Sequence, residues 1–168
     1  ARGLAAMDRN GKSDPYVKVE VIDWQRGSKT GSKLRTTPKY GVTEATFNES
    51  TVFVGGAAWH QHLSVRALND GNFSDKGFGS CIIGFPVLAS LKLRKVQNST
   101  LDEQSLPAVP PVPPVDAQHV PKISELETSG SWMRLRGDRK SEKKGAVVCI
   151  RVERLAFDDS FQCKTDVP

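Results

Sequence analysis

Alternation of apolar and polar residues with a period of two is the dominant pattern along this chain. From Tyr16 to Asp23, valines at every second position point to one side and polar residues to the other, which is typical of a half-buried β-strand. Strand-like patterns recur in six further segments: Ser32–Thr37, Thr46–Val54, Leu63–Leu68, Ser80–Pro86, Ser131–Leu135 and Ala146–Arg154. Turn residues separate them, and one short helix is expected near Val87–Leu93. The pattern predicts an all-β antiparallel sandwich.

The segment from Val96 to Gly130 does not follow this pattern. It contains six of the chain's ten prolines and has neither a helical nor a strand period. Such a stretch inside a compact domain is normally an insertion without a packed core of its own. We therefore predict a single domain over residues 1–168 with a Pro-rich, acidic insertion loop at 96–130. The P-x-x-P spacing from Pro107 to Pro110 leaves two interpretations open, a ligand for a proline-recognition module and a solvated linker.

Length and composition restrict the class of protein. A chain of 168 residues with 38% hydrophobic content fits one domain with a core, and no apolar run approaches the ~18 residues of a membrane-spanning helix. Three cysteines are an odd and sparse set, so we expect a reducing compartment and a cytoplasmic protein. No secretion leader precedes the domain, and we expect the chain to be part of a larger protein.

The net charge of +5 is unevenly distributed. The insertion carries five acidic residues against one lysine, a net of −4, so the rest of the chain carries +9. A basic body suits anionic partners such as lipid headgroups. Nucleic acid is not expected as a partner, because aromatic residues make up 7% of the chain and no basic helix, zinc or RNP pattern is present.

Asp8 and Asp14 flank a loop that leads directly into the first alternating strand. Carboxylates on a flexible loop are the ligands that a hard cation such as calcium requires, and Pro15 at the first position of a strand costs no ladder hydrogen bond. The same residue types also form ordinary turns. The loop by itself therefore leaves both a cation site and a plain turn open.

Several segments together resemble the C2 domain, a β-sandwich family that docks on membranes, often through calcium. The chain begins A-R-G-L, M-D and N-G-K-S-D-P-Y-V-K-V, and continues with T-T-P-K and F-N-E-S-T-V-F. The segments L-S-V-R-A-L-N-D-G-N-F-S-D and W-M-R-L resemble the family's third loop and closing strands. The resemblance implies an eight-stranded C2-type sandwich in the circularly shifted, phospholipase type of topology, with the first strand largely missing.

In C2 domains calcium binds between the loops at one end of the sandwich. The resemblance places first-loop ligands at Asp8 and Asp14, and third-loop candidates at Asn69, Asp70 and Asp75. Calcium affinity follows the number of carboxylates, and Asn69 stands where the family usually has one. We therefore predict weak or degenerate calcium binding, with a Kd of ~10⁻⁴ M or weaker.

The resemblance also implies a phosphoinositide-binding face at Tyr16, Lys18, Lys33 and Arg35. Strand alternation independently places Tyr16 and Lys18 on one outward face, and Lys33 with Arg35 on one face of the next strand. Phe73 matches a loop-tip position at which the family inserts an apolar side chain into the membrane. The alternative is a solvated basic surface with Phe73 folded onto its own loop.

The expected function is a peripheral membrane-targeting module in signalling, which binds anionic phospholipids or phosphoinositides with weak calcium dependence. No enzymatic activity is expected, because no catalytic frame, phosphate-loop spacing or zinc-ligand set is present. Two alternatives stay open. One is a calcium-independent protein interaction or scaffold module that uses the basic face or the Pro-rich insertion, and the other is a regulatory fragment of a lipid-signalling enzyme.

Overall fold

The structure is a computed structural model that describes residues 1–23, 25, 28–51, 53, 60–71, 74–91, 93–96 and 130–157. Its strands are Pro15–Asp23 (β1), Ser28–Arg35 (β2), Gln61–Asn69 (β3), Lys76–Gly84 (β4), Leu93–Val96 (β5), Ser131–Arg134 (β6), Val147–Ile150 (β7) and Arg154–Phe157 (β8). Its helices are Phe85–Ser90 (α1) and Arg139–Lys143 (α3). Neither helix in this described part is long and apolar enough to cross a membrane.

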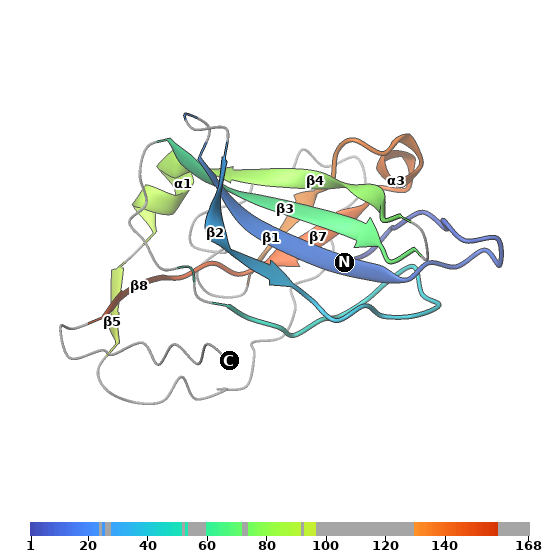
Figure 1. The fold of residues 1–168 in the computed structure, drawn as a ribbon, viewed down its shortest axis with the longest axis horizontal. Coiled ribbons are helices and arrows are strands. Elements are labelled where there is room, and N and C mark those ends of the chain that lie inside the picture. Colours follow the sequence, from blue (N-terminus) through green and yellow to red (C-terminus); the bar gives the residue numbers. More distant parts are fainter. Residues whose placement is uncertain are drawn as a thin grey trace.

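Strands β2, β1, β3 and β4 form one antiparallel sheet in that order, with β1 and β3 at its centre (Figure 1). β1 pairs with β3 along its whole length, from Pro15 opposite Asn69 to Asp23 opposite Gln61. Successive side chains of a strand point to opposite faces. The register therefore directs the alternate valines of β1 to the inner face and its charged residues to the outer face.

A second layer lies behind this sheet and contains β6 and β7 (Figure 1). The N-terminal segment extends that layer, because Arg2 and Val147 exchange two backbone hydrogen bonds. Buried side chains from both layers form one apolar core: Leu4, Val17, Val65, Ala67, Phe78, Leu135, Ala146 and Val148. The described residues thus form the layered arrangement expected of a β-sandwich.

Gly79 allows β4 to approach the second layer closely. Its φ of +127° favours glycine, and a Cβ atom at this position would lie 2.8 Å from the carbonyl oxygen of Arg136. Next to it, Ser80 and Arg136 exchange two backbone hydrogen bonds of 2.7 and 2.9 Å. The contact joins the sheet to the segment that leads from β6 into α3.

The alternating pattern located most of these elements. Strands β1, β2, β3, β4 and β6 and helix α1 confirm the corresponding predictions to within a few residues. The strand predicted at Thr46–Val54 is wrong for residues 46–51 and 53, which have irregular backbone. Asn48 in this stretch has a φ of +50°, which is incompatible with an extended strand.

The C-terminal part differs from the prediction in two ways. The strand predicted over Ala146–Arg154 is divided, because β7 ends at Ile150 and β8 begins at Arg154. β8 pairs in parallel with β5, whereas a wholly antiparallel sandwich was predicted. Apart from Val96 and Gly130, the predicted insertion lies outside the described residues.

Candidate functional site

Asn69, the last residue of β3, connects the predicted third loop to both ends of the first loop. Its side chain is buried; the Oδ1 atom accepts the backbone N–H of Asp14 at 2.6 Å, and the Nδ2 atom donates to Asp8 Oδ1 at 3.0 Å. An aspartate at this position would lack the N–H group that reaches Asp8. The two loops are thus joined by hydrogen bonds from one amide side chain.

Asp14 is also bonded to its neighbours on the chain's own backbone. Its Oδ1 atom accepts the N–H of Gly41 at 2.7 Å, and its carbonyl oxygen accepts the N–H of Asp70 at 2.8 Å. The first loop itself is closed by Ser13, whose buried hydroxyl accepts the N–H of Met7 and donates to the carbonyl oxygen of Ala5. These contacts fix the loop without any contribution from a metal ion.

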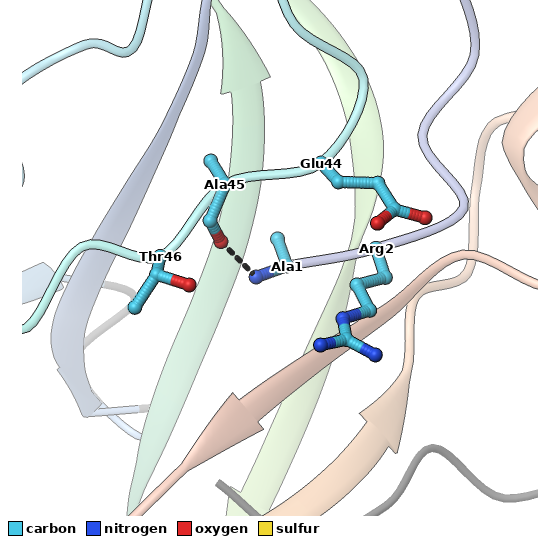
Figure 2. Close-up of a pocket in the computed structure, with 5 residues that line it drawn as sticks. All are labelled: Ala1, Arg2, Glu44, Ala45 and Thr46. Atoms are coloured by element: carbon cyan, nitrogen blue, oxygen red, sulfur yellow. Dashed lines mark hydrogen bonds between the residues drawn. The ribbon is translucent and has the colours of Figure 1, made fainter.

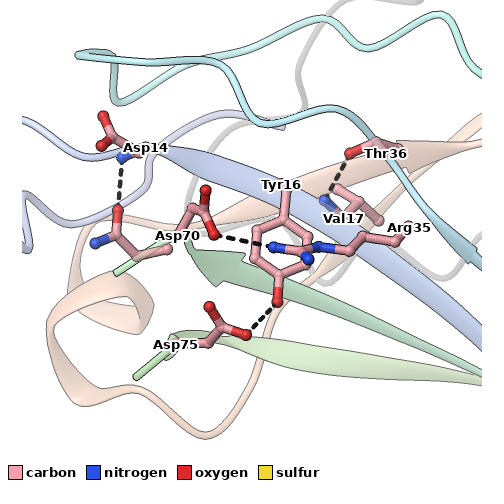
Figure 3. Close-up of polar contacts among 8 residues, drawn as sticks. Asp14, Tyr16, Val17, Arg35, Thr36, Asp70 and Asp75 are labelled. Atoms are coloured by element: carbon pink, nitrogen blue, oxygen red, sulfur yellow. Dashed lines mark hydrogen bonds and ion pairs between the residues drawn. The ribbon is translucent and has the colours of Figure 1, made fainter. Parts of the chain in front are cut away.

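Asp70 and Asp75, the other two predicted carboxylates, face protein donors (Figure 3). Asp70 Oδ1 lies 2.9 Å from Arg35 Nη2, and Asp75 Oδ2 accepts the hydroxyl of Tyr16 at 2.7 Å. The guanidinium of Arg35 lies 4.3 Å from the centre of the Tyr16 ring, a cation–π contact. Burial, and then the hydrogen bond to Asp75, raise the pKa of Tyr16 to about 12.

This arrangement does not fit a calcium cage. Calcium takes about six to eight oxygen ligands, and within the described residues no group of three or more His, Cys, Asp or Glu side chains could hold a metal ion. Each of the four aspartates instead accepts a hydrogen bond from a protein donor. Asn69, the fifth predicted ligand, uses its oxygen for Asp14.

The predicted lipid-binding residues belong to the outer face of the sheet. In one row across the strands Arg35 lies opposite Lys18, and Lys18 lies opposite Arg66. In the next row Lys33 lies opposite Glu20. We call Lys18, Lys33, Arg35 and Arg66 the basic sheet face.

Glu20 lies among these cations and is buried. It forms ion pairs with Lys18, at 3.1 Å, and with Arg66. Burial alone would raise the pKa of Glu20, but the hydrogen bonds and positive charges of Lys18 and Arg66 outweigh it, and the pKa is lowered. Glu20 is therefore ionised at neutral pH and offsets one of the four positive charges.

The four predicted lipid ligands of this face differ in what they can offer to a ligand. Lys33 is exposed and forms no ion pair with any described residue. Arg35 and Lys18 are accessible in part but already hold Asp70 and Glu20. Tyr16 shares their face but is 2% exposed beneath Arg35, so its hydroxyl serves Asp75 and not the surface.

Two features of the site were missed at the sequence level, and one prediction lies outside the described residues. Arg66 was missed, although its place in the alternating strand Leu63–Leu68 put it on the outer face. The amide of Asn69 as a donor to Asp8 was missed because no local pattern reports a contact 61 residues away. Phe73, the predicted membrane-inserting residue, lies outside the described residues.

A small pocket lies at the N-terminal end of the described chain (Figure 2). Ala1, Arg2, Glu44, Ala45 and Thr46 line it, and the amino group of Ala1 donates to the carbonyl oxygen of Ala45 at 2.7 Å. Its volume of about 130 Å³ is well below the ~300–1,000 Å³ of typical small-molecule sites. We therefore place the candidate site at the loops and the basic sheet face.

Comparison with known proteins identifies the class. A model of the C2 domain family matches residues 1–102, which is more than half of the chain. The chain therefore belongs to the C2 domain family, which confirms the resemblance found in the sequence. Members of this family commonly mediate membrane binding or protein interaction.

Among solved structures, the chain is similar to the crystal structure of a C2 domain, domain A, of RIM from Drosophila. The two sequences are 20% identical, and the match covers 51% of this chain and 68% of that chain with a TM-score of 0.43.

Proposed function

We propose that this C2 domain is a peripheral membrane-binding module whose basic sheet face binds anionic phospholipids, phosphoinositides included. The observation that carries the proposal is the arrangement of Lys18, Lys33, Arg35 and Arg66 in two adjacent rows with one carboxylate, Glu20, between them. A compact face with a net charge of +3 attracts a surface of phosphate and carboxylate headgroups. In this proposal the domain acts by binding and not as an enzyme.

Exposed cations near an anionic bilayer each contribute on the order of 1 kcal/mol. Lys33 can make this contribution in full, because no described carboxylate holds it. Arg35 has 51% of its side chain exposed and can turn part of its guanidinium to a headgroup while it remains over Tyr16. Affinity is therefore expected to come from several partial contacts and to weaken as salt screens them.

Ile82 adds an apolar element to the same face. It lies opposite Ser64, which lies opposite Glu20, and it is 59% exposed at the β4 side of the sheet. An apolar side chain beside a row of cations suits the boundary between headgroups and acyl chains. This combination supports a lipid surface as the partner in our proposal.

We further infer that calcium contributes little to this binding. Support comes from the hydrogen bonds that engage the side chains of Asp8, Asp14, Asn69, Asp70 and Asp75. A calcium ion would have to replace those donors before it gained ligands. We expect a Kd of ~10⁻⁴ M or weaker by isothermal titration, and a micromolar site would contradict this inference.

Lys33→Gln tests the proposed face with the least risk to the fold, because Lys33 is exposed. We expect it to weaken binding to phosphatidylserine vesicles about fivefold, the effect of about 1 kcal/mol. Lys33→Arg keeps the charge and should bind like the unmodified domain. If Lys33→Gln and Lys33→Arg bind anionic vesicles equally well, the basic sheet face is not the lipid contact.

A protein-binding role is the second candidate, because the family also mediates protein interaction. That role predicts no dependence on anionic lipid, so vesicle binding separates the two candidates. The cytoplasmic location, the circularly shifted topology and the membrane insertion of Phe73 remain predictions.

A further inference from the structure

The segment between β6 and β7 forms a second basic surface. Residues 136–144 contain five basic and two acidic side chains, a net of +3 in nine residues. Seven of the nine residues are exposed, and they surround the short helix α3. The segment lies beyond residues 1–102, so the C2 family match does not account for it.

Both carboxylates of this segment are directed to its own backbone. Asp138 caps α3 by accepting the N–H of Ser141 at 2.7 Å, and Glu142 Oε1 accepts the N–H of Gly137 at 2.6 Å. Five cations remain that form no ion pair with any described residue: Arg136, Arg139, Lys140, Lys143 and Lys144. We call these five side chains the α3 basic surface.

The fold holds this surface in a defined place. Ser141 is fully buried, and its hydroxyl accepts the N–H of Ala5 at 3.3 Å. A Cβ atom on Gly3 would lie 2.9 Å from the carbonyl oxygen of Lys144, so the two chain segments pack closely. Because residues 3–5 lead into the first loop, the α3 basic surface stands at the loop end of the domain, beside the start of β4 (Figure 1).

We propose that the α3 basic surface is a second contact with an anionic lipid bilayer, separate from the basic sheet face. The proposal rests on the proposed function in that both faces bind the same class of membrane. A short helix that projects from the end of the domain, with nearly all its residues exposed, offers no enclosed cavity. Such a surface fits an extended anionic sheet, and it holds the loop end against the bilayer.

The triple variant Arg139→Gln, Lys140→Gln and Lys143→Gln tests this contact. Glutamine keeps helix propensity, and all three side chains are exposed, so the fold should persist with an unchanged unfolding temperature. We expect binding to phosphatidylserine vesicles to fall roughly a hundredfold at low salt, and the difference to shrink at high salt. A charge-keeping control exchanges each of the three residues for the other basic type, Arg for Lys or Lys for Arg, and should bind normally.

Amine footprinting supplies a local readout that a general loss of charge would not give. Vesicles rich in phosphatidylserine should protect Lys140, Lys143 and Lys144 from acetylation, whereas neutral phosphatidylcholine vesicles should not. Normal vesicle affinity of the folded triple glutamine variant would overturn the proposal. So would unprotected lysines in the bound domain.

The Lys33→Gln variant separates this proposal from the proposed function. A loss of affinity in Lys33→Gln but not in the α3 variant refutes the α3 contact and leaves the sheet face in place. The reverse result supports the α3 contact and refutes the sheet face. Failure of the unmodified domain to bind any anionic vesicle refutes both.

Discussion

Asn69 shows, at the scale of one residue, why counting carboxylates did not define the loop site. The sequence indicated which oxygens are near the loops, but not which donors reach them first. In the structure the amide of Asn69 bonds both Asp14 and Asp8 while it is buried. The loops are therefore held together in a way that does not require a cation.

Asn69→Asp is expected to destabilise the domain by about 2–4 kcal/mol without calcium, because it replaces a buried donor with a charge next to Asp8 and Asp14. Added calcium should restore part of the loss, since the change supplies a carboxylate between two others. Thermal unfolding with calcium and with chelator measures both effects. In the control Asn69→Ala, calcium should have no effect, and equal unfolding of Asn69→Asp in calcium and in chelator would contradict the account.

Glu20→Gln should change stability and binding in opposite directions. The folded-state pKa of Glu20 is lowered, so its ionised form stabilises the fold fully above the unfolded value of ~4.3 and loses this effect as pH falls through the folded value. The variant should be less stable by about 1–3 kcal/mol at neutral pH, and the difference should vanish at acid pH.

The same substitution releases Lys18 and Arg66 from their ion pairs, so affinity for anionic vesicles should rise about fivefold. Chemical denaturation across pH and vesicle titration measure the two effects. Glu44→Gln, at an exposed position, should leave the acid dependence of stability unchanged. A stability difference for Glu20→Gln that persists at acid pH would show that a packing change is responsible.

At the scale of elements, sequence patterns succeeded where one face of a strand meets the core. β1 and β3 alternate because Val17 and Val65 pack inward while Lys18 and Arg66 face outward. The pattern did not identify α3, because five residues are too few for a helical period and the helix depends on its Asp138 cap. The partners of Tyr16 and Asp70 were also out of reach, since such contacts depend on how distant strands are placed.

The junction of β4 with the second layer gives an element-scale prediction. Gly79→Ala adds both left-handed strain and a contact of 2.8 Å with the Arg136 carbonyl, so it should destabilise by more than about 2 kcal/mol. Gly137→Ala is the matched control, because its φ of +110° gives similar strain with nothing within 4 Å. Equal losses for the two variants in chemical denaturation would show that the close approach at Gly79 does not matter.

At the scale of the whole molecule, the charge distribution supports a domain that is ready to bind membranes without a metal switch. The basic sheet face and the α3 basic surface lie on different elements, and each carries a net of +3. Two such surfaces on one rigid body give a steep dependence on both salt and the fraction of anionic lipid.

The most direct test of this account is cosedimentation of the unmodified domain with phosphatidylserine vesicles at matched ionic strength, in chelator and in calcium. The account predicts binding in chelator that calcium changes by less than about twofold, and no binding to neutral phosphatidylcholine vesicles. Binding that appears only when calcium is added, or that is equal on neutral and anionic vesicles, would contradict it.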